Sequence, residues 1–347
     1  MNNILIMTNM GPYKGNSYSG RFVFNQYQYI LKDLNNNYSL FFMSPNGTGK
    51  AFSLIKYVIY LFRFIKFSFS SKRFDLLHVH YYYPTIFFAV LYKFLFNNNV
   101  KIIVTFHGSD VFNYRVAPFL YKYFYDFVDH SFFVSKGLKE KFSLSCNNEN
   151  YSILSAGVLP LLRDDYCTAY DKIYDLCIIG TINKNKRVSE FIDLISSYSK
   201  RCLKIVIVGG GDLRDLNSSI DISEHDVSYL GEKEISEIKD IYLSSYFTIS
   251  CSIVESFGLT ISESLSLGTP VIATKTDGSI EQIEDGKNGF IFDFSQEGLN
   301  TVLTKAFEMS VSDYKVMSSF SISSSEKYKI SNVASEIIKK YDSVLSH

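Results

Sequence analysis

The sequence lacks the features of a nucleic-acid-binding or membrane-spanning protein. Its 35 Lys and Arg residues are balanced by 35 Asp and Glu residues, so the net charge is zero and gives no case for nucleic acid as a partner. No apolar run approaches the roughly 20 residues that a transmembrane helix needs. The longest strongly apolar stretch without charge, residues 81–92, is too short. The chain begins directly with an apolar strand and without a signal-peptide layout, which indicates a cytoplasmic protein.

Cysteines are also few, and their spacing matches no metal-binding or redox motif. We therefore expect buried thiols in a reducing cytosol. The five are Cys146, Cys167, Cys177, Cys202 and Cys251. Three histidines, His78, His80 and His107, could suggest a metal site, but no cysteine or acid completes a ligand set. The sequence therefore predicts no metal there.

The length and the distribution of charge divide the chain in two. With 347 residues, the chain is longer than one typical domain, and two are expected. Residues 1–160 hold 16 Lys and Arg against 7 Asp and Glu, a balance of about +9, while the remainder holds 19 against 28, about −9. Aromatic residues also gather in the first half. A basic, aromatic half suits an anionic membrane surface.

The most basic segment of that half is residues 50–73, which carries six cations and no acid. Residues 51–69 are expected to form a helix rich in Phe, Tyr, Leu and Ile, with Lys56, Arg63 and Lys66 as its charges. Such a helix fits a membrane interface, where cations meet lipid phosphates. A helix packed in the domain core with snorkelling lysines has the same composition. Both interpretations stay open, and each can apply to a different face.

The pattern of residues 246–274 predicts a strand, a glycine turn, a short helix and a second strand. Residues 255–263 read Glu-Ser-Phe-Gly-Leu-Thr-Ile-Ser-Glu. A helix that begins in this turn presents free N–H groups and the positive end of its dipole, which favours an anion. Glu255 stands at the mouth of the turn, and Glu263 is expected about two helical turns on, on about the same face. A phosphate-binding turn between acids that can bind hydroxyls suits a nucleotide-sugar.

This run resembles the signature of the family 4 retaining glycosyltransferases of the GT-B fold: Glu, seven residues, Glu, with Phe-Gly-Leu inside, then Gly-x-Pro-Val-Ile-Ala. Residues 104–110, Val-Thr-Phe-His-Gly-Ser-Asp, resemble a second signature of that family. The resemblance implies an α/β protein with two doubly wound, Rossmann-like domains that face each other across a cleft. The implied parts are residues 1–160 on the acceptor side, residues 161–325 for the nucleotide-sugar, and a terminal helix in residues 326–347 that crosses back.

The resemblance also assigns roles to residues. Lys186 and the backbone of Phe257, Gly258 and Leu259 would hold the donor diphosphate, beside Gly180 at a strand end. Glu263 would bind the ribose hydroxyls and Glu255 the sugar hydroxyls near the reacting carbon. His107 would orient the sugar, and Gly20, in the first loop, would leave room for it. Thr181 stands where the family has an arginine, so Lys184 or Arg187 would have to replace that arginine.

The implied reaction is transfer of a sugar from a UDP- or GDP-linked donor, with retention of configuration and without a metal. The acceptor would be a glycan or a lipid-linked saccharide in the synthesis of a bacterial surface polysaccharide, such as an O-antigen, a lipopolysaccharide or a capsule. The enzyme would work peripherally at the inner face of the membrane. Two alternatives remain: a nucleotide-sugar epimerase of the same fold, and a non-catalytic partner subunit.

Overall fold

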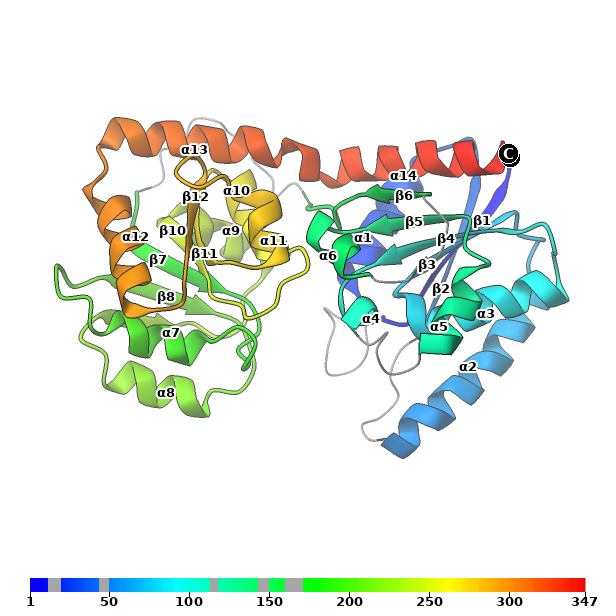
Figure 1. Ribbon diagram of the computed structural model, residues 1–347, viewed down its shortest axis with the longest axis horizontal. Helices are drawn as coiled ribbons and strands as arrows, with labels where there is room; N and C mark the ends of the chain where they lie inside the picture. Colours follow the sequence, from blue (N-terminus) through cyan, green and yellow to red (C-terminus); the bar gives the residue numbers. More distant parts are fainter. Residues whose placement is uncertain (12–19, 44–49, 113–117, 143–149, 160–170, 347) are drawn as a thin grey trace. The chain divides into compact units, whose positions relative to one another are not determined.

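The chain forms two compact units, each built on a six-stranded parallel sheet (Figure 1). The computed structural model describes residues 1–11, 20–43, 50–112, 118–142, 150–159 and 171–346. One unit contains Met1–Gly157 together with Ile330–His347, and the other contains Val158–Lys329. This confirms the predicted α/β class with two Rossmann-like domains. The predicted boundary at residues 160–161 lies outside the described residues.

The sheet of the first unit has the strand order β2-β1-β3-β4-β5-β6. The strands are β1 (Asn3–Thr8), β2 (Asn37–Phe42), β3 (Leu76–His80), β4 (Lys101–Phe106), β5 (His130–Phe133) and β6 (Tyr151–Ile153). Continuous apolar runs such as residues 102–104 form its centre because helices cover both faces of a parallel sheet. The strand order reverses between β1 and β3, and ligands of such sheets bind at the carboxyl ends of the strands near this reversal.

Two helices cover one face of this sheet. Val23 and Ile30 of α1 (Arg21–Ile30) pack with Val333 and Ile337 of the terminal helix α14 (Ile330–Leu345) over the apolar side chains of the strands. The other helices of this unit are α2 (Lys50–Ser70), α3 (Tyr82–Leu95), α4 (Ser109–Phe112), α5 (Pro118–Tyr125) and α6 (Lys136–Lys141). The terminal segment of the chain is thus part of the first unit.

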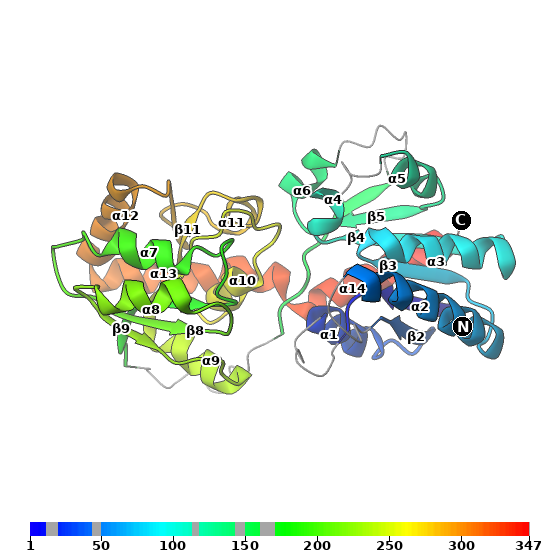
Figure 2. The ribbon, with the colours of Figure 1, turned by 90° about the horizontal axis from the view of Figure 1, so that it is seen from below.

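The basic segment forms α2, which lies beside α3 (Figure 2). Its residue Phe64 is buried against Phe41 of β2 and Phe88 of α3. On other sides of the helix, Phe62 and Arg63 are exposed. One face is therefore core and another is open, so neither interpretation of this segment excludes the other. In the described part of the chain, no helix combines the length and hydropathy that crossing a membrane requires.

The sheet of the second unit has the order β12-β11-β10-β7-β8-β9, so its strand order reverses between β7 and β10. The strands are β7 (Tyr174–Ile179), β8 (Lys204–Val208), β9 (Asp226–Tyr229), β10 (Ser245–Ser250), β11 (Val271–Thr274) and β12 (Gly289–Phe292). The helices are α7 (Val188–Ile195), α8 (Arg214–Asp221), α9 (Ile235–Leu243), α10 (Leu259–Ser266), α11 (Asp277–Gln282), α12 (Gln296–Glu308) and α13 (Val311–Ser325).

Apolar side chains of α7, α8 and α12 form the core on one face of this sheet, and those of α9 and α10 pack on the other. Cys177 and Cys251 are buried in these cores, as expected for structural thiols. Cys202 is exposed, which corrects the expectation for that residue, because it lies in the turn before β8 rather than in the strand. Cys146 and Cys167 lie outside the described residues.

Candidate active site

The turn before α10 presents a row of free backbone donors. Gly258 precedes the helix with φ +84°, a left-handed conformation that glycine adopts without a steric penalty. Among the described residues, the backbone N–H groups of Phe257, Gly258, Leu259 and Thr260 form no hydrogen bond. The turn follows β10, one of the two strands between which the order reverses. The sequence-based expectation of an anion site at this helix N-terminus therefore has its donors in place.

A lysine and a glutamate meet beside this turn. The Nζ atom of Lys186 lies 2.5 Å from Oε2 of Glu255, and both side chains are about three-quarters buried, with 25% and 21% exposed. The resemblance assigned these residues to different groups of the donor. In the structure they bind each other.

Asn185 explains how these two residues meet. Its side chain donates to the carbonyl of Val254 and accepts from the N–H of the same residue, each at 3.0 Å. Its own carbonyl accepts from the N–H of Ile253 at 2.8 Å. These bonds join the loop after β7 to the loop after β10. Sequence reasoning missed Asn185, since nothing in the run Asn-Lys-Asn-Lys separates it from an ordinary polar loop.

Glu263 lies on α10, where its Oε2 accepts a hydrogen bond of 3.2 Å from the hydroxyl of Tyr242. Burial raises the pKa of this carboxyl to about 7, although the Tyr242 hydroxyl and the Lys186 charge act in the opposite direction. The expectation that Glu255 and Glu263 share a helix face is wrong. The helix begins only at Leu259, because the left-handed Gly258 separates it from the loop that carries Glu255.

Gly180 and Thr181 follow β7 at the same edge of the sheet. They line a small hollow together with Lys186, Ser250 and Thr260. Gly180 has φ +145°, and Thr181 is exposed. The hollow places these residues beside the amino end of α10.

Of the two cations that could replace the missing arginine, Arg187 already has partners. Its Nε donates to the carbonyl of Cys251 at 2.8 Å, and its guanidinium carbon lies 3.8 Å from the ring centre of Phe294. Lys184 is exposed on the same loop. Lys184 is therefore the better candidate for the role of the arginine.

In the first unit, His107 follows β4 and is enclosed by rings. Its Nε2 lies 3.1 Å from Nδ1 of His80, at the end of β3. The ring centres of Phe22 and Tyr81 lie 4.8 Å and 4.6 Å from that of His107. Burial, with His80 as a further cause, lowers the pKa of His107 well below its ordinary value, so the imidazole is neutral. Gly20 stands before α1 with φ +69°.

Asp110 fixes the backbone around His107. This buried carboxylate accepts hydrogen bonds from the N–H groups of Tyr82, His107 and Gly108 at 2.8–3.3 Å. One side chain therefore joins the ends of β3 and β4. Sequence reasoning had noted this acid only as a neighbour of the histidine.

His78, His80 and His107 lie close together, but each forms hydrogen bonds through its ring nitrogens. The Nδ1 of His78 lies 2.5 Å from the Tyr341 hydroxyl, and its Nε2 lies 2.7 Å from Oγ1 of Thr105. In the described residues, no group of three His, Cys, Asp or Glu side chains is arranged to hold a metal ion.

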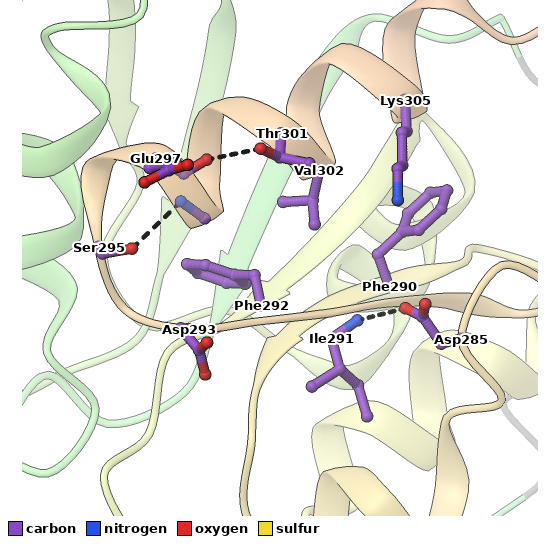
Figure 3. A pocket seen from close by; sticks show the side chains of 11 residues that line it. Asp285, Phe290, Ile291, Phe292, Asp293, Ser295, Glu297, Thr301, Val302 and Lys305 are labelled. Carbon is purple, nitrogen blue, oxygen red and sulfur yellow. Dashed lines mark hydrogen bonds between the residues drawn. The ribbon is translucent and has the colours of Figure 1, made fainter.

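A larger hollow of about 340 Å³ lies at the edge of the second sheet, between β12 and α12 (Figure 3). Polar side chains around it form hydrogen bonds with nearby backbone groups. Asp285 accepts from the N–H of Ile291, and the Thr301 hydroxyl donates to the carbonyl of Glu297. None of the predicted site residues lines this hollow, so it is not part of the site described above.

Two family models match the chain. Residues 168–320 match the model of glycosyl transferases group 1, and residues 35–158 match that of glycosyltransferase family 4. An uncharacterized glycosyltransferase of Methanocaldococcus jannaschii is 26% identical over 249 residues, 70% of this chain and 68% of that protein. The N-acetyl-alpha-D-glucosaminyl L-malate synthase of Bacillus anthracis is 26% identical over 244 residues, 64% of this chain and 62% of that enzyme.

Among solved structures, the HepE protein of Anabaena in complex with UDP and glucose has a TM-score of 0.72 at 15% identity, covering 99% of this chain and 100% of that one. At that identity the likeness concerns the fold alone, and it agrees with the two parallel sheets seen here. The two family models, over residues 35–158 and 168–320, and the glycosyltransferase relatives identify this chain as a glycosyltransferase of the family 4 type, and its two parallel sheets agree with the GT-B fold.

Proposed function

We propose that the donor is a UDP- or GDP-sugar whose diphosphate binds at the amino end of α10, and that the sugar is transferred with retention of configuration. The observation that carries the proposal is the row of free amides at residues 257–260 beside the ammonium group of Lys186. Oriented N–H groups, a helix dipole and a lysine together compensate a diphosphate without a metal. The UDP in the HepE complex supports a uridine donor.

For the other residues we propose the roles that the resemblance to family 4 assigns. The Glu263 carboxylate accepts hydrogen bonds from the ribose hydroxyls, and Glu255 accepts them from the transferred sugar. His107, as a neutral imidazole, exchanges a hydrogen bond with a sugar hydroxyl, and Gly20 leaves space for that sugar. Gly180 lets the donor approach the end of β7.

Catalysis in this proposal is electrostatic. The bond between the anomeric carbon and the β-phosphate oxygen breaks, and its electron pair leaves with the phosphate. The acceptor hydroxyl attacks the same face of the sugar and passes its proton to the departing phosphate oxygen. Lys186 and the amides of the turn stabilise the charge that develops on that phosphate. Glu255 lies near enough to Lys186 to stabilise the cationic sugar at the same time.

For the acceptor, we propose a lipid-linked saccharide of a surface polysaccharide or lipopolysaccharide, met at the inner face of a bacterial membrane. The supporting observation is the open face of α2. There, Phe62 and Phe69 are exposed beside Arg63 and Lys66, on a segment without any acid. Exposed aromatics with cations suit an anionic lipid surface.

The direct test is a panel of nucleotide-sugars, screened first for thermal stabilisation and then for transfer to saccharide acceptors. We expect one UDP- or GDP-sugar to raise the melting temperature by several degrees at about 100 times its dissociation constant. Lys186→Met should remove most of that shift. If no nucleotide or nucleotide-sugar binds, a non-catalytic partner subunit is the better account. If the sugar is altered without any acceptor, the protein is an epimerase.

A further inference from the structure

Gln282, at the end of α11, is a buried side chain that touches the anion-binding turn from behind. It is only 4% exposed. Its Nε2 donates to the carbonyls of Phe257 and Gly258, the latter at 3.2 Å. Its Oε1 accepts from the hydroxyl of Ser262, one turn into α10. The amide therefore uses both donors and one acceptor position within the same turn.

These contacts determine where the free N–H groups of the turn point. In a trans peptide the carbonyl and the following N–H lie on opposite sides of the chain. Holding the carbonyl of Phe257 toward Gln282 therefore directs the N–H of Gly258 away from it. The carbonyl of Gly258 accepts from Gln282 and from the N–H groups of Ile261 and Ser262, which together direct the N–H of Leu259 away from Gln282. These two amides are among those without a partner in the described residues.

The position of α11 supports this arrangement. A Cβ on Gly278 would lie 2.3 Å from the carbonyl oxygen of Phe257, so glycine is needed for the helix to come this close. The N–H of Gly278 donates to the carbonyl of Glu255 at 2.7 Å. The start and the end of α11 thus hold the two ends of the segment that carries Glu255 and the turn.

Glutamate, lysine and apolar residues of similar size do not satisfy this position. A glutamate would place carboxylate oxygens against two carbonyls, and a lysine could not accept from Ser262. An apolar residue would leave the carbonyl of Phe257 without its hydrogen bond and free to rotate, whereas the carbonyl of Gly258 would keep its bonds from the N–H groups of Ile261 and Ser262.

We propose that Gln282 is a positioning residue for the donor diphosphate: it fixes the peptides of residues 257–259 so that their N–H groups face the phosphate. This inference rests on the proposed function of the turn. Gln282 acts through the backbone and does not touch the ligand. Its loss should therefore affect binding of the phosphates and leave binding of the base and ribose unchanged.

The test compares a nucleoside diphosphate with its nucleoside in the full-length protein. UDP and uridine, or GDP and guanosine if the protein prefers guanine, are titrated into the wild type and into Gln282→Met, which keeps the size of the side chain without its hydrogen bonds. We expect the affinity for the diphosphate to fall by about tenfold or more and that for the nucleoside to stay within about twofold. Gln282→Glu should lose as much affinity for the diphosphate, because a carboxylate cannot donate to the two carbonyl oxygens and is repelled by them.

Gln296→Met is the matched control. Gln296 lies on α12, where its amide donates to Asn300 at 3.0 Å, away from the turn. If Gln282→Met loses affinity equally for the diphosphate and the nucleoside, or keeps its affinity for both, the positioning role is wrong, although the donor site itself still stands. If the wild type binds neither UDP nor GDP, the proposed function itself is wrong, and this inference falls with it. Melting temperatures of all variants identify any general loss of folding.

Discussion

At the scale of single residues, the ion pair between Lys186 and Glu255 decides how the site responds to a ligand. Their charged atoms lie 2.5 Å apart. A diphosphate must therefore compete with Glu255 for the ammonium group. Once it does so, the released carboxylate is free to bind the sugar.

The variant Glu255→Gln should separate binding from chemistry. We expect nucleoside diphosphate binding to tighten by up to about fivefold, because a partly exposed ion pair contributes about 1 kcal/mol or less. The rate of sugar transfer should fall by about tenfold or more, because the carboxylate acts near the reacting carbon. Calorimetry and initial rates measure the two effects. A variant that binds more weakly and reacts as fast as the wild type would show that Glu255 has another role.

Glu263 should make donor binding depend on pH. Burial raises the pKa of its carboxyl from an ordinary 4.5 to about 7. Only the ionised form accepts hydrogen bonds from both ribose hydroxyls, so affinity should rise as the pH increases through about 7. Glu263→Gln should remove this dependence. Nucleotide titrations at about pH 6 and pH 8 measure it, and an equal pH dependence in both proteins would exclude Glu263 as its source.

The same group gives a prediction for stability. A folded-state pKa above the unfolded value means that the folded protein binds the proton more tightly. The wild type should therefore lose stability relative to Glu263→Gln as the pH rises from about 4.5 to about 7, because in this range the unfolded chain releases the proton that the folded protein retains, and the difference should level off above about pH 7. Urea unfolding across this range measures the difference. A constant difference would contradict the raised pKa.

At the scale of elements, the loops after the strands are fixed by a few buried side chains. Asp110 illustrates this for the end of β4, since it accepts hydrogen bonds from N–H groups in the loops after both β3 and β4. Asp110→Ala leaves these donors buried and unsatisfied, which should cost roughly 2–4 kcal/mol of unfolding free energy. Asp110→Asn keeps one acceptor oxygen and should cost less. Urea denaturation ranks the two, and equal small costs would mean that water replaces the carboxylate.

The open face of α2 gives a prediction about membranes. Lys56 is half-buried, and burial lowers its pKa, so the exposed cations Arg63 and Lys66 are the ones to test. Replacing both by glutamate should release the protein from phosphatidylserine liposomes at low salt, because each cation contributes about 1 kcal/mol to the free energy of binding an anionic surface. Nucleotide binding should stay unchanged. The control replaces exposed Lys204 and Lys315 of the second unit in the same way. If the wild-type protein does not bind the liposomes, a soluble acceptor becomes the better proposal.

At the scale of the whole molecule, the sheets were predictable, and the contacts within the site were less so. Runs such as residues 4–7 and 102–104 are apolar throughout because both faces of a parallel sheet are buried, and this pattern is visible in the sequence. The turn at Gly258 was also recognisable, because a glycine lies there between a predicted strand and a predicted helix.

The sequence does not show which side chains meet across loops. Lys186 and Glu255 are 69 residues apart, and Gln282 reaches Phe257 across 25. These contacts depend on how two βα loops pack against each other, and no local pattern encodes that. The same is true of His80 and His107, whose hydrogen bond follows from the pairing of β3 with β4.

The charge compensation proposed for the whole enzyme predicts that it needs no divalent metal. Transfer activity should survive excess EDTA within about twofold, because Lys186 and the helix dipole stabilise the leaving diphosphate. Initial rates with and without chelator measure this. Loss of activity that Mg²⁺ or Mn²⁺ restores would contradict the metal-free proposal.

The central claim is that the donor diphosphate binds at the amino end of α10. A crystal structure of the protein with the nucleoside diphosphate that stabilises it most would test this directly. We predict phosphate oxygens within hydrogen-bonding distance of the N–H groups of Gly258 and Leu259, with Nζ of Lys186 moved from Glu255 to the phosphate. A diphosphate bound elsewhere on the chain, with Lys186 still paired to Glu255, would contradict the account.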